Sequence, residues 1–122
     1  GISPAKTERE HVETYKLPLD FMDMIVYTGF GYPGRNLMLT RASDAVIIGC
    51  GRMGTLNEFT IAFEDRKPIG VLLGSGGTTE WVDELIRDSH RTADTPVVYD
   101  ADPKTLVEKV IELIKKEKVV NV

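Results

Sequence analysis

The stretch that decides the fold runs from residue 45 to residue 58 and reads AVIIGCGRMGTLNE. It begins as a continuous apolar run, which is typical of a strand covered on both faces of a parallel sheet. It then crosses a corner that carries Gly49, Gly51 and Gly54 and enters a helical pattern. Glycine lets the backbone approach a ligand closely, and the N–H groups at a helix start favour anions. The stretch therefore predicts a strand, an anion-binding corner and a helix, and it raises the question of what the Glu58 carboxylate faces.

The rest of the chain repeats this alternation. Three further apolar runs predict strands, and they read MIVYT at 24–28, IGVLL at 69–73 and PVVYD at 96–100. Helical patterns occupy 35–43, 55–66, 81–86 and the segment from 102 onward. Alternation of strands and helices with short connections predicts an α/β fold with a mainly parallel sheet. We expect a single domain over residues 1–122.

The first residues, GISPA at 1–5, look like the end of a strand that nothing precedes. A doubly wound domain starts with its own strand and helix, so we expect its first strands to be missing. An uncovered sheet edge is a pairing hazard. We therefore expect a partner chain or a missing segment at that edge.

Helix-start signals accompany two of the predicted helices. Thr78 and Thr79 are candidate N-caps for the helix over 81–86. Asp102 followed by Pro103 predicts an N-cap and a first helical position. In that last helix, Glu112 and Lys116 form a predicted i,i+4 ion pair.

Composition excludes several classes of function. The 122 residues carry a formal net charge of −4, which argues against binding to a nucleic-acid backbone. No apolar run approaches the ~20 residues that a helix needs to span a bilayer. Cys50 is the only cysteine, so a reducing cytoplasm is favoured. His11, His90 and Cys50 stand at unrelated spacings, so we expect no metal site.

Glycine-rich corners follow three of the predicted strands, at 29–34, 49–55 and 74–79. In a parallel sheet these corners share the carboxyl edge, where open α/β folds bind ligands. A phosphate-bearing small molecule is the natural occupant. Neither the six-residue glycine fingerprint of dinucleotide binding nor the G-x-x-x-x-G-K-[ST] motif is present.

The string GRMGTLNE at 51–58 resembles the P-G-G-x-G-T-x-x-E motif of the LONELY GUY family, which comprises cytokinin riboside 5′-monophosphate phosphoribohydrolases. Arg35 stands where that family places the arginine of its R-K motif, nine residues before the aspartate matched by Asp44. The amino-acid sequence of the chain is also similar to that of a related branch of Rossmann-like nucleotide-binding proteins, which includes molybdenum-cofactor carriers. The resemblance covers most of the chain, up to about residue 114, and implies a Rossmann-like, three-layer α/β/α architecture.

The resemblance also implies roles for individual residues. Gly51, Gly54 and Thr55 would cradle a 5′-phosphate at the helix start. Glu58 would point to the ribose, and Arg35 would hold the ribose or the phosphate. Glu58 and Arg35 are thus the candidate catalytic residues. The candidate phosphate- or nucleotide-binding residues are Gly51, Arg52, Met53, Gly54, Thr55, Gly29, Gly31 and Asn36.

These roles imply nucleoside 5′-monophosphate binding, with hydrolysis of the N-glycosidic bond as the enzyme hypothesis. No cofactor is expected beyond a bound nucleotide or phosphate. The alternative is a non-catalytic binder or carrier of a nucleotide or molybdenum cofactor. It is favoured by Arg52 in place of the motif's second glycine, by Asn36 in place of lysine, and by the closer similarity to the branch that includes the carriers. Cys50 in place of the motif's proline is a further departure from the family. In the family the active site is completed across a homodimer, so we expect a homodimer or higher homo-oligomer.

Plainer interpretations of the same residues stay open. Glu58 could be a first-turn carboxylate favoured by the helix dipole, and Arg35 an ion-pairing surface residue. Cys50 is expected to be a small buried residue, and His11 a surface residue. Trp81 is expected in the core or an interface rather than as a platform for a base.

Overall fold

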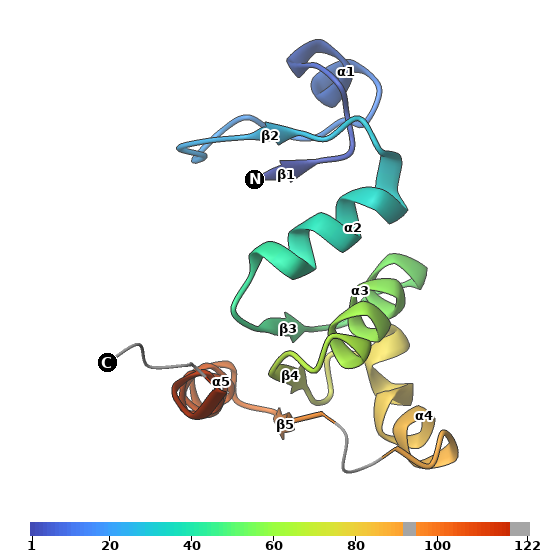
Figure 1. The fold of residues 1–122 in the computed structure, drawn as a ribbon, viewed down its shortest axis with the longest axis vertical. Helices are drawn as coiled ribbons and strands as arrows, with labels where there is room; N and C mark the ends of the chain where they lie inside the picture. Colours follow the sequence, from blue (N-terminus) through green and yellow to red (C-terminus); the bar gives the residue numbers. More distant parts are fainter. Residues whose placement is uncertain (92–94, 118–122) are drawn as a thin grey trace. The chain divides into compact units, whose positions relative to one another are not determined.

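The computed structural model describes residues 1–91 and 95–117. Its contacts divide the chain into two compact units, Gly1–Ala42 and Ser43–Val122. Both units contain parallel strands and helices (Figure 1), so the predicted α/β fold class is confirmed. The two units are described separately, and a single domain over residues 1–122 stays a prediction.

The first unit pairs two short parallel strands and carries two helices. β1 pairs with β2 in the register Ile2↔Val26, so the opening residues form a strand, as the sequence suggests. α1 was not predicted; the Thr7 side chain caps it by accepting from the Glu10 N–H. α2 begins four residues earlier than predicted, because Pro33 fits the first turn of a helix. The elements are β1 Ile2–Ser3, α1 Glu8–Glu13, β2 Val26–Tyr27 and α2 Gly31–Ala42.

His11 lies inside this unit, not on its surface as predicted; only 3% of it is exposed. Its Nδ1 lies 2.8 Å from Ser3 Oγ and its Nε2 lies 2.9 Å from the Pro18 carbonyl oxygen. A carbonyl only accepts, so Nε2 carries the ring hydrogen and Nδ1 accepts from the Ser3 hydroxyl. The ring thereby ties β1, α1 and the following loop together.

Replacing His11 with Ala should destabilise the protein by about 1–3 kcal/mol, because it leaves a buried hydroxyl and a carbonyl without their partner. Urea unfolding measures the change. His90→Asn is the matched control, because His90 is exposed, has a φ of 57° and asparagine tolerates that conformation. Equal free energies of unfolding for the two variants would contradict the structural role of the buried ring.

The second unit is a three-stranded parallel sheet in the order β3-β4-β5. Ile48 pairs with Val71, and Val71 pairs with Tyr99, so the carboxyl ends of the strands are aligned. All three strands lie within the predicted apolar runs. The elements are β3 Val46–Ile48, α3 Met53–Glu64, β4 Ile69–Leu72, the 3₁₀ turn η1 Gly77–Trp81, α4 Val82–Asp88, β5 Val97–Asp100 and α5 Pro103–Glu117.

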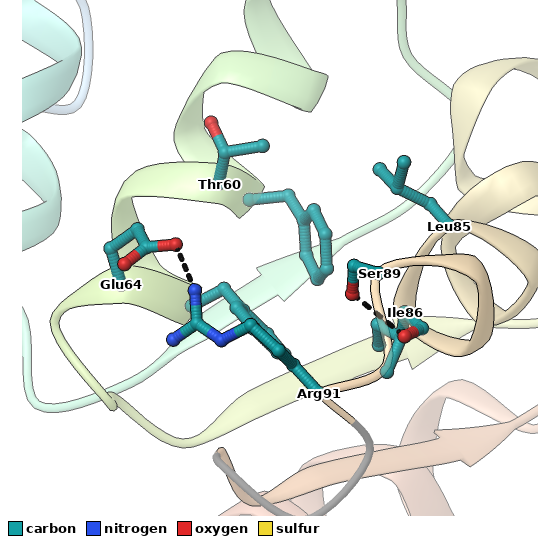
Figure 2. Close-up of a pocket in the computed structure, with 8 residues that line it drawn as sticks. Thr60, Glu64, Leu85, Ile86, Ser89 and Arg91 are labelled. Atoms are coloured by element: carbon teal, nitrogen blue, oxygen red, sulfur yellow. Dashed lines mark hydrogen bonds and ion pairs between the residues drawn. The ribbon is translucent and has the colours of Figure 1, made fainter.

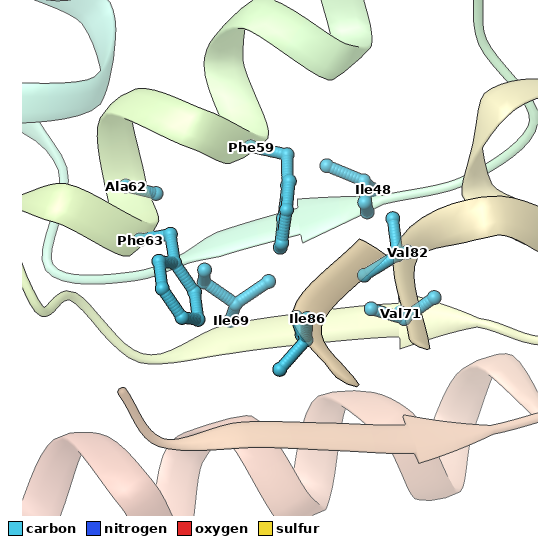
Figure 3. Packing of buried hydrophobic residues seen from close by; sticks show 8 residues of the cluster. All are labelled: Ile48, Phe59, Ala62, Phe63, Ile69, Val71, Val82 and Ile86. Carbon is cyan, nitrogen blue, oxygen red and sulfur yellow. The ribbon is translucent and has the colours of Figure 1, made fainter. Parts of the chain in front are cut away.

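Helices cover both faces of this sheet. α3 and α4 pack on one face, where Figure 3 shows the buried apolar cluster. On the other face, the missing side chain of Gly70 points to Leu106 and Val110 of α5, which are both buried. The unit therefore has three layers. The cluster under α3 and α4 consists of Ile48, Phe59, Ala62, Phe63, Ile69, Val71, Val82 and Ile86.

The helix-start predictions were correct for α5 and wrong before α4. Asp102 Oδ2 accepts from the Thr105 N–H at 2.8 Å. The hydrogen bond from the Thr105 hydroxyl is the main cause that lowers the pKa of Asp102 below its ordinary value. Thr78 and Thr79 lie inside the 3₁₀ turn and do not cap α4. In α5, Glu112 pairs with Lys115 at 2.9 Å and not with Lys116 as predicted, one residue closer along the helix.

Within the part of the chain that the structure describes, no helix combines the length and apolar character required to cross a membrane.

Candidate functional site

The corner between β3 and α3 has the sharp backbone that its glycines predict. Cys50 and Gly51 both have positive φ angles, 48° and 99°. A Cβ atom at Gly51 would overlap the Thr55 side chain, so only glycine fits there. Cys50 is exposed, and the prediction that it is a small buried residue was wrong. Its position in the turn, immediately before the helix, keeps its side chain out of the core.

The glycine-rich corner after β4 packs directly against this first corner. A Cβ atom at Gly77 would overlap the Gly51 carbonyl oxygen, and the φ of Gly77 is 63°. The Thr78 N–H donates to the Gly51 carbonyl and the Thr78 hydroxyl donates to the Arg52 carbonyl, both at 3.1 Å. Ser75 Oγ accepts from the Cys50 N–H at 2.7 Å. Hydrogen bonds from Thr78 of the second corner therefore already use the Gly51 and Arg52 carbonyl oxygens of the first corner.

The N–H groups of residues 53–55, at the start of α3, have no such partners in the part of the chain that the structure describes. Leu56 is the first residue of α3 whose N–H donates within the helix, to the Arg52 carbonyl. No side chain caps this helix. Among the described residues, no protein acceptor takes the N–H groups of Met53, Gly54 and Thr55. Free N–H donors at a helix start, combined with the helix dipole, favour an anion.

Glu58 follows Gly54 by one turn on the same face of α3, roughly 5 Å along the axis. The core side of the helix is formed by Phe59, Ala62 and Phe63, so Glu58 lies on the flank of the helix. It is partly exposed, and no hydrogen bond or ion pair to another described residue involves its carboxylate. The Thr55 hydroxyl is likewise not engaged by any described residue. Both side chains are therefore available to a ligand.

An open groove of about 490 Å³ adjoins the corner. Arg52 lines it, and no described residue pairs with its guanidinium. Trp81 is 61% exposed, so it does not lie in the core, and its other predicted place, an interface, stays a prediction. The cause is that α4 begins only at Val82, whose side chain enters the core in place of the indole. The lining residues are Gly51, Arg52, Met53, Gly77, Thr78 and Trp81.

The other predicted site residues belong to the first unit. Gly29 follows β2, Gly31 begins α2, and Asn36 is buried in that helix. Arg35 donates from its Nη1 to the Ile2 carbonyl at 3.3 Å and from its Nε to Asn36 Oδ1 at 3.1 Å. Its guanidinium also lies over the Tyr32 ring, 5.6 Å from the centroid. Within its own unit Arg35 is thus a connecting residue, and its role toward a ligand stays a prediction.

The structure thus brings together Gly51, Arg52, Met53, Gly54, Thr55 and Glu58 in the second unit. Sequence reasoning missed Thr78 and Trp81 as members of this site. The signal for Thr78 was present, because it lies in the third glycine-rich corner at the same sheet edge. Because Thr78 was interpreted as an N-cap of the following helix, its contact with the first corner was not predicted. Trp81 had no comparable signal.

A second, smaller pocket of about 180 Å³ lies between α3 and α4 (Figure 2). Its walls include the rings of Phe59 and Phe63. Arg91 forms an ion pair with Glu64 at its rim and also lies over the Phe63 ring, 5.2 Å from the centroid. The ion pair with Glu64 therefore already compensates the charge of Arg91. This pocket is for that reason a weaker candidate for anion binding than the corner.

Among residues 1–91 and 95–117, no group of three or more His, Cys, Asp or Glu side chains could hold a metal ion. The anion-binding features of the corner come from the backbone and from Arg52.

Comparison with known proteins identifies the family. A family model described as the SLOG cluster4 family matches residues 1–107. The chain belongs to the SLOG cluster4 family. SLOG denotes the SMF/DprA-LOG superfamily, which includes the LONELY GUY proteins, so the wider resemblance is confirmed and the particular branch is not.

A solved structure agrees with the fold of this SLOG protein. The crystal structure of TM1055, a structural genomics target, matches with a TM-score of 0.62 and 24% sequence identity. The match covers 80% of this chain and 56% of the TM1055 chain, so the SLOG chain spans little more than half of that structure. At this identity the likeness supports the Rossmann-like fold alone. The search of curated proteins returned no match.

Gly51→Ala should destabilise the SLOG protein by about 1–3 kcal/mol and abolish binding of inorganic phosphate, because the new Cβ overlaps Thr55 and the φ is positive. Urea unfolding and titration calorimetry measure the two effects. Gly54→Ala is the matched control: a Cβ there meets nothing within 4 Å, so stability should be unchanged or rise by up to about 1 kcal/mol. Equal stability of the two variants would contradict the tight corner.

Proposed function

We propose that this SLOG protein binds a nucleoside 5′-monophosphate, with the phosphate at the corner formed by residues 51–55. One observation carries the proposal: the carbonyls of Gly51 and Arg52 are occupied by Thr78, while the N–H groups of Met53, Gly54 and Thr55 are not engaged by described residues. Such a corner presents donors alone, and a phosphate presents acceptors alone. Membership of the SLOG cluster4 family supports nucleotide binding or a related activity.

The position of Glu58 favours a sugar phosphate over a free anion. A carboxylate would repel a phosphate in direct contact, but Glu58 stands one helical turn beyond the N–H groups, about 5 Å along the axis. A ribose attached to the phosphate spans that distance. Its hydroxyl groups would donate to the carboxylate. Arg52 lines the groove beside the corner and adds a positive charge next to these N–H groups.

The enzyme hypothesis is hydrolysis of the N-glycosidic bond. Water adds its oxygen to C1′ of the ribose as the bond from C1′ to the base nitrogen breaks, and the products are ribose 5-phosphate and the free base. The transition state carries positive charge on the sugar ring. The Glu58 carboxylate would stabilise that charge or orient the attacking water. Arg35 would hold the ribose or phosphate, a role that rests on the family resemblance.

Glu58→Gln should lower the release of ribose 5-phosphate from AMP by roughly 100-fold or more, because the amide cannot stabilise the positive charge. The dissociation constant for AMP should change little, because the phosphate donors are intact. Chromatographic detection of free base and ribose 5-phosphate measures turnover, and calorimetry measures binding. Glu84→Gln, an exposed carboxylate on α4, serves as the matched control. If the wild-type protein binds AMP but releases no base, the enzyme hypothesis is wrong.

The second candidate function is a non-catalytic binder or carrier of a nucleotide or molybdenum cofactor. It is favoured by Arg52, which lines the groove where the hydrolases carry glycine, and by Asn36, which is buried where they carry lysine. Under this alternative, a ligand raises the melting temperature and is recovered unchanged. Glu58→Gln then leaves both affinity and ligand recovery as they are in the wild type.

Assembly into a homodimer or a higher homo-oligomer forms part of the same proposal, because the resembled family completes its site across two chains. Light scattering coupled to size-exclusion chromatography measures the assembly. A monomer that binds AMP with full affinity would remove this part and leave the phosphate site standing.

A further inference from the structure

β5 lies at one end of the three-stranded sheet of the second unit. It pairs with β4 on one side, and no described strand pairs with its other side, which is called the free edge below. An unpaired strand edge presents N–H and C=O groups that can pair with another chain. Val97, Val98 and Tyr99 are β-branched or aromatic residues, which favour strand pairing. An edge of this composition is a pairing hazard unless something blocks it.

The hydrogen bonds to β4 show which backbone groups of β5 face the free edge. The Leu73 N–H donates to the Asp100 carbonyl at 2.9 Å, so Asp100 turns its carbonyl towards the β4 side. Neighbouring residues of a strand turn their N–H and C=O groups to opposite sides. The N–H and C=O groups of Tyr99, and of Val97 two residues earlier, therefore face the free edge.

Lys109 of α5 uses one of these groups. Its Nζ donates to the Tyr99 carbonyl at 3.0 Å and lies 2.8 Å from Asp100 Oδ2. The hydrogen bond from Lys109 is the main cause that lowers the pKa of Asp100 below its ordinary value, so this carboxylate stays charged and holds the ammonium group in place. Exposed ion pairs of this kind contribute little to stability. The consequence of the contact therefore lies in the Tyr99 carbonyl that it occupies.

We propose that Lys109 prevents the free edge of β5 from pairing with the same edge of a second copy of the chain. Antiparallel pairing around a twofold axis at Val98 would place Val97 of each copy opposite Tyr99 of the other. Each of these two residue pairs would exchange two hydrogen bonds, so four bonds would form. Two of the four need the Tyr99 carbonyl that Lys109 already uses.

The space beside the free edge is open to such a strand. A groove of about 570 Å³ lies between β5 and α5, and its lining includes Val97, Val98 and Tyr99 but no residue of β4. The groove is therefore on the outer side of β5. Lys109 lines it as well, so the ammonium group stands where a pairing strand would have to enter. This device is separate from the proposed phosphate site and is tested without a ligand.

Lys109→Met should strengthen association through β5, because the two regained hydrogen bonds lower the dissociation constant of the edge-paired dimer about tenfold or more. Analytical ultracentrifugation over a concentration series measures the step from the wild-type species to twice its mass. An assembly that the wild type forms through another surface is common to all variants and does not interfere. Amide hydrogen exchange locates the contact, because the Val97 and Tyr99 N–H groups should become protected on association.

Lys104→Met is the matched control, because Lys104 is an exposed lysine of the same helix and the substitution changes the charge equally. It should associate like the wild type. Adding Val97→Pro to Lys109→Met tests the pairing itself. Proline lacks the N–H that faces the free edge and leaves the bonds to β4 in place, so the double variant should return to the wild-type mass.

Asp100→Asn keeps the lysine but removes the charge that holds it, so it should shift association in the same direction as Lys109→Met. It decides the test if Lys109→Met does not fold. Wild-type mass of the folded Lys109→Met variant, or of Asp100→Asn in its place, would overturn the proposal. So would association of the double variant, equal association of Lys104→Met, or association that leaves the two amides unprotected.

Discussion

The backbone contact between two glycine-rich corners is the constraint on which the site depends. Gly77 approaches the Gly51 carbonyl so closely that any Cβ atom would overlap it. This approach lets Thr78 donate to both the Gly51 and Arg52 carbonyls. A buried or crowded corner normally has to satisfy donors and acceptors together. Here the Gly51 and Arg52 carbonyls are satisfied by a neighbouring corner, while the N–H groups of residues 53–55 are left to a ligand, and this separation makes the corner attractive to anions.

The sheet brings the two corners together. β3 and β4 are adjacent and parallel, and Ile48 pairs with Val71, so the corners that follow them leave the sheet side by side. The same two residues belong to the buried cluster that holds α3 and α4 on the sheet. The core therefore fixes the direction of α3 and the position of η1 at once. A substitution that weakened the packing of Ile48 or Val71 would therefore shift the N–H groups of residues 53–55, although neither residue contacts those groups directly.

Much of this arrangement could be predicted from the sequence, because strong local signals coincided with the fold. Continuous apolar runs marked β3, β4 and β5, and Asp102 with Pro103 marked the start of α5. The failures concern tertiary contacts. His11 is buried because Ser3 and Pro18 both reach it, and neither lies near it in the periodic pattern. Trp81 is exposed because a 3₁₀ turn, rather than helix, precedes α4, and apolar spacing alone does not distinguish the two.

The comparison among helix starts explains why a carboxylate can stand near an anion site. α1 and α5 begin with side-chain oxygens, from Thr7 and Asp102, that accept N–H groups of their first turns. At the capping position before α3 stands Arg52, whose side chain has no acceptor, so the first N–H groups of this helix stay open. Glu58 follows one turn after Gly54, and no hydrogen bond joins its carboxylate to a described residue. The arginine at the capping position and the carboxylate that no described residue engages carry opposite charges roughly 9 Å apart along the helix axis. A sugar phosphate has the same polarity, with an anion at one end and hydroxyl donors at the other.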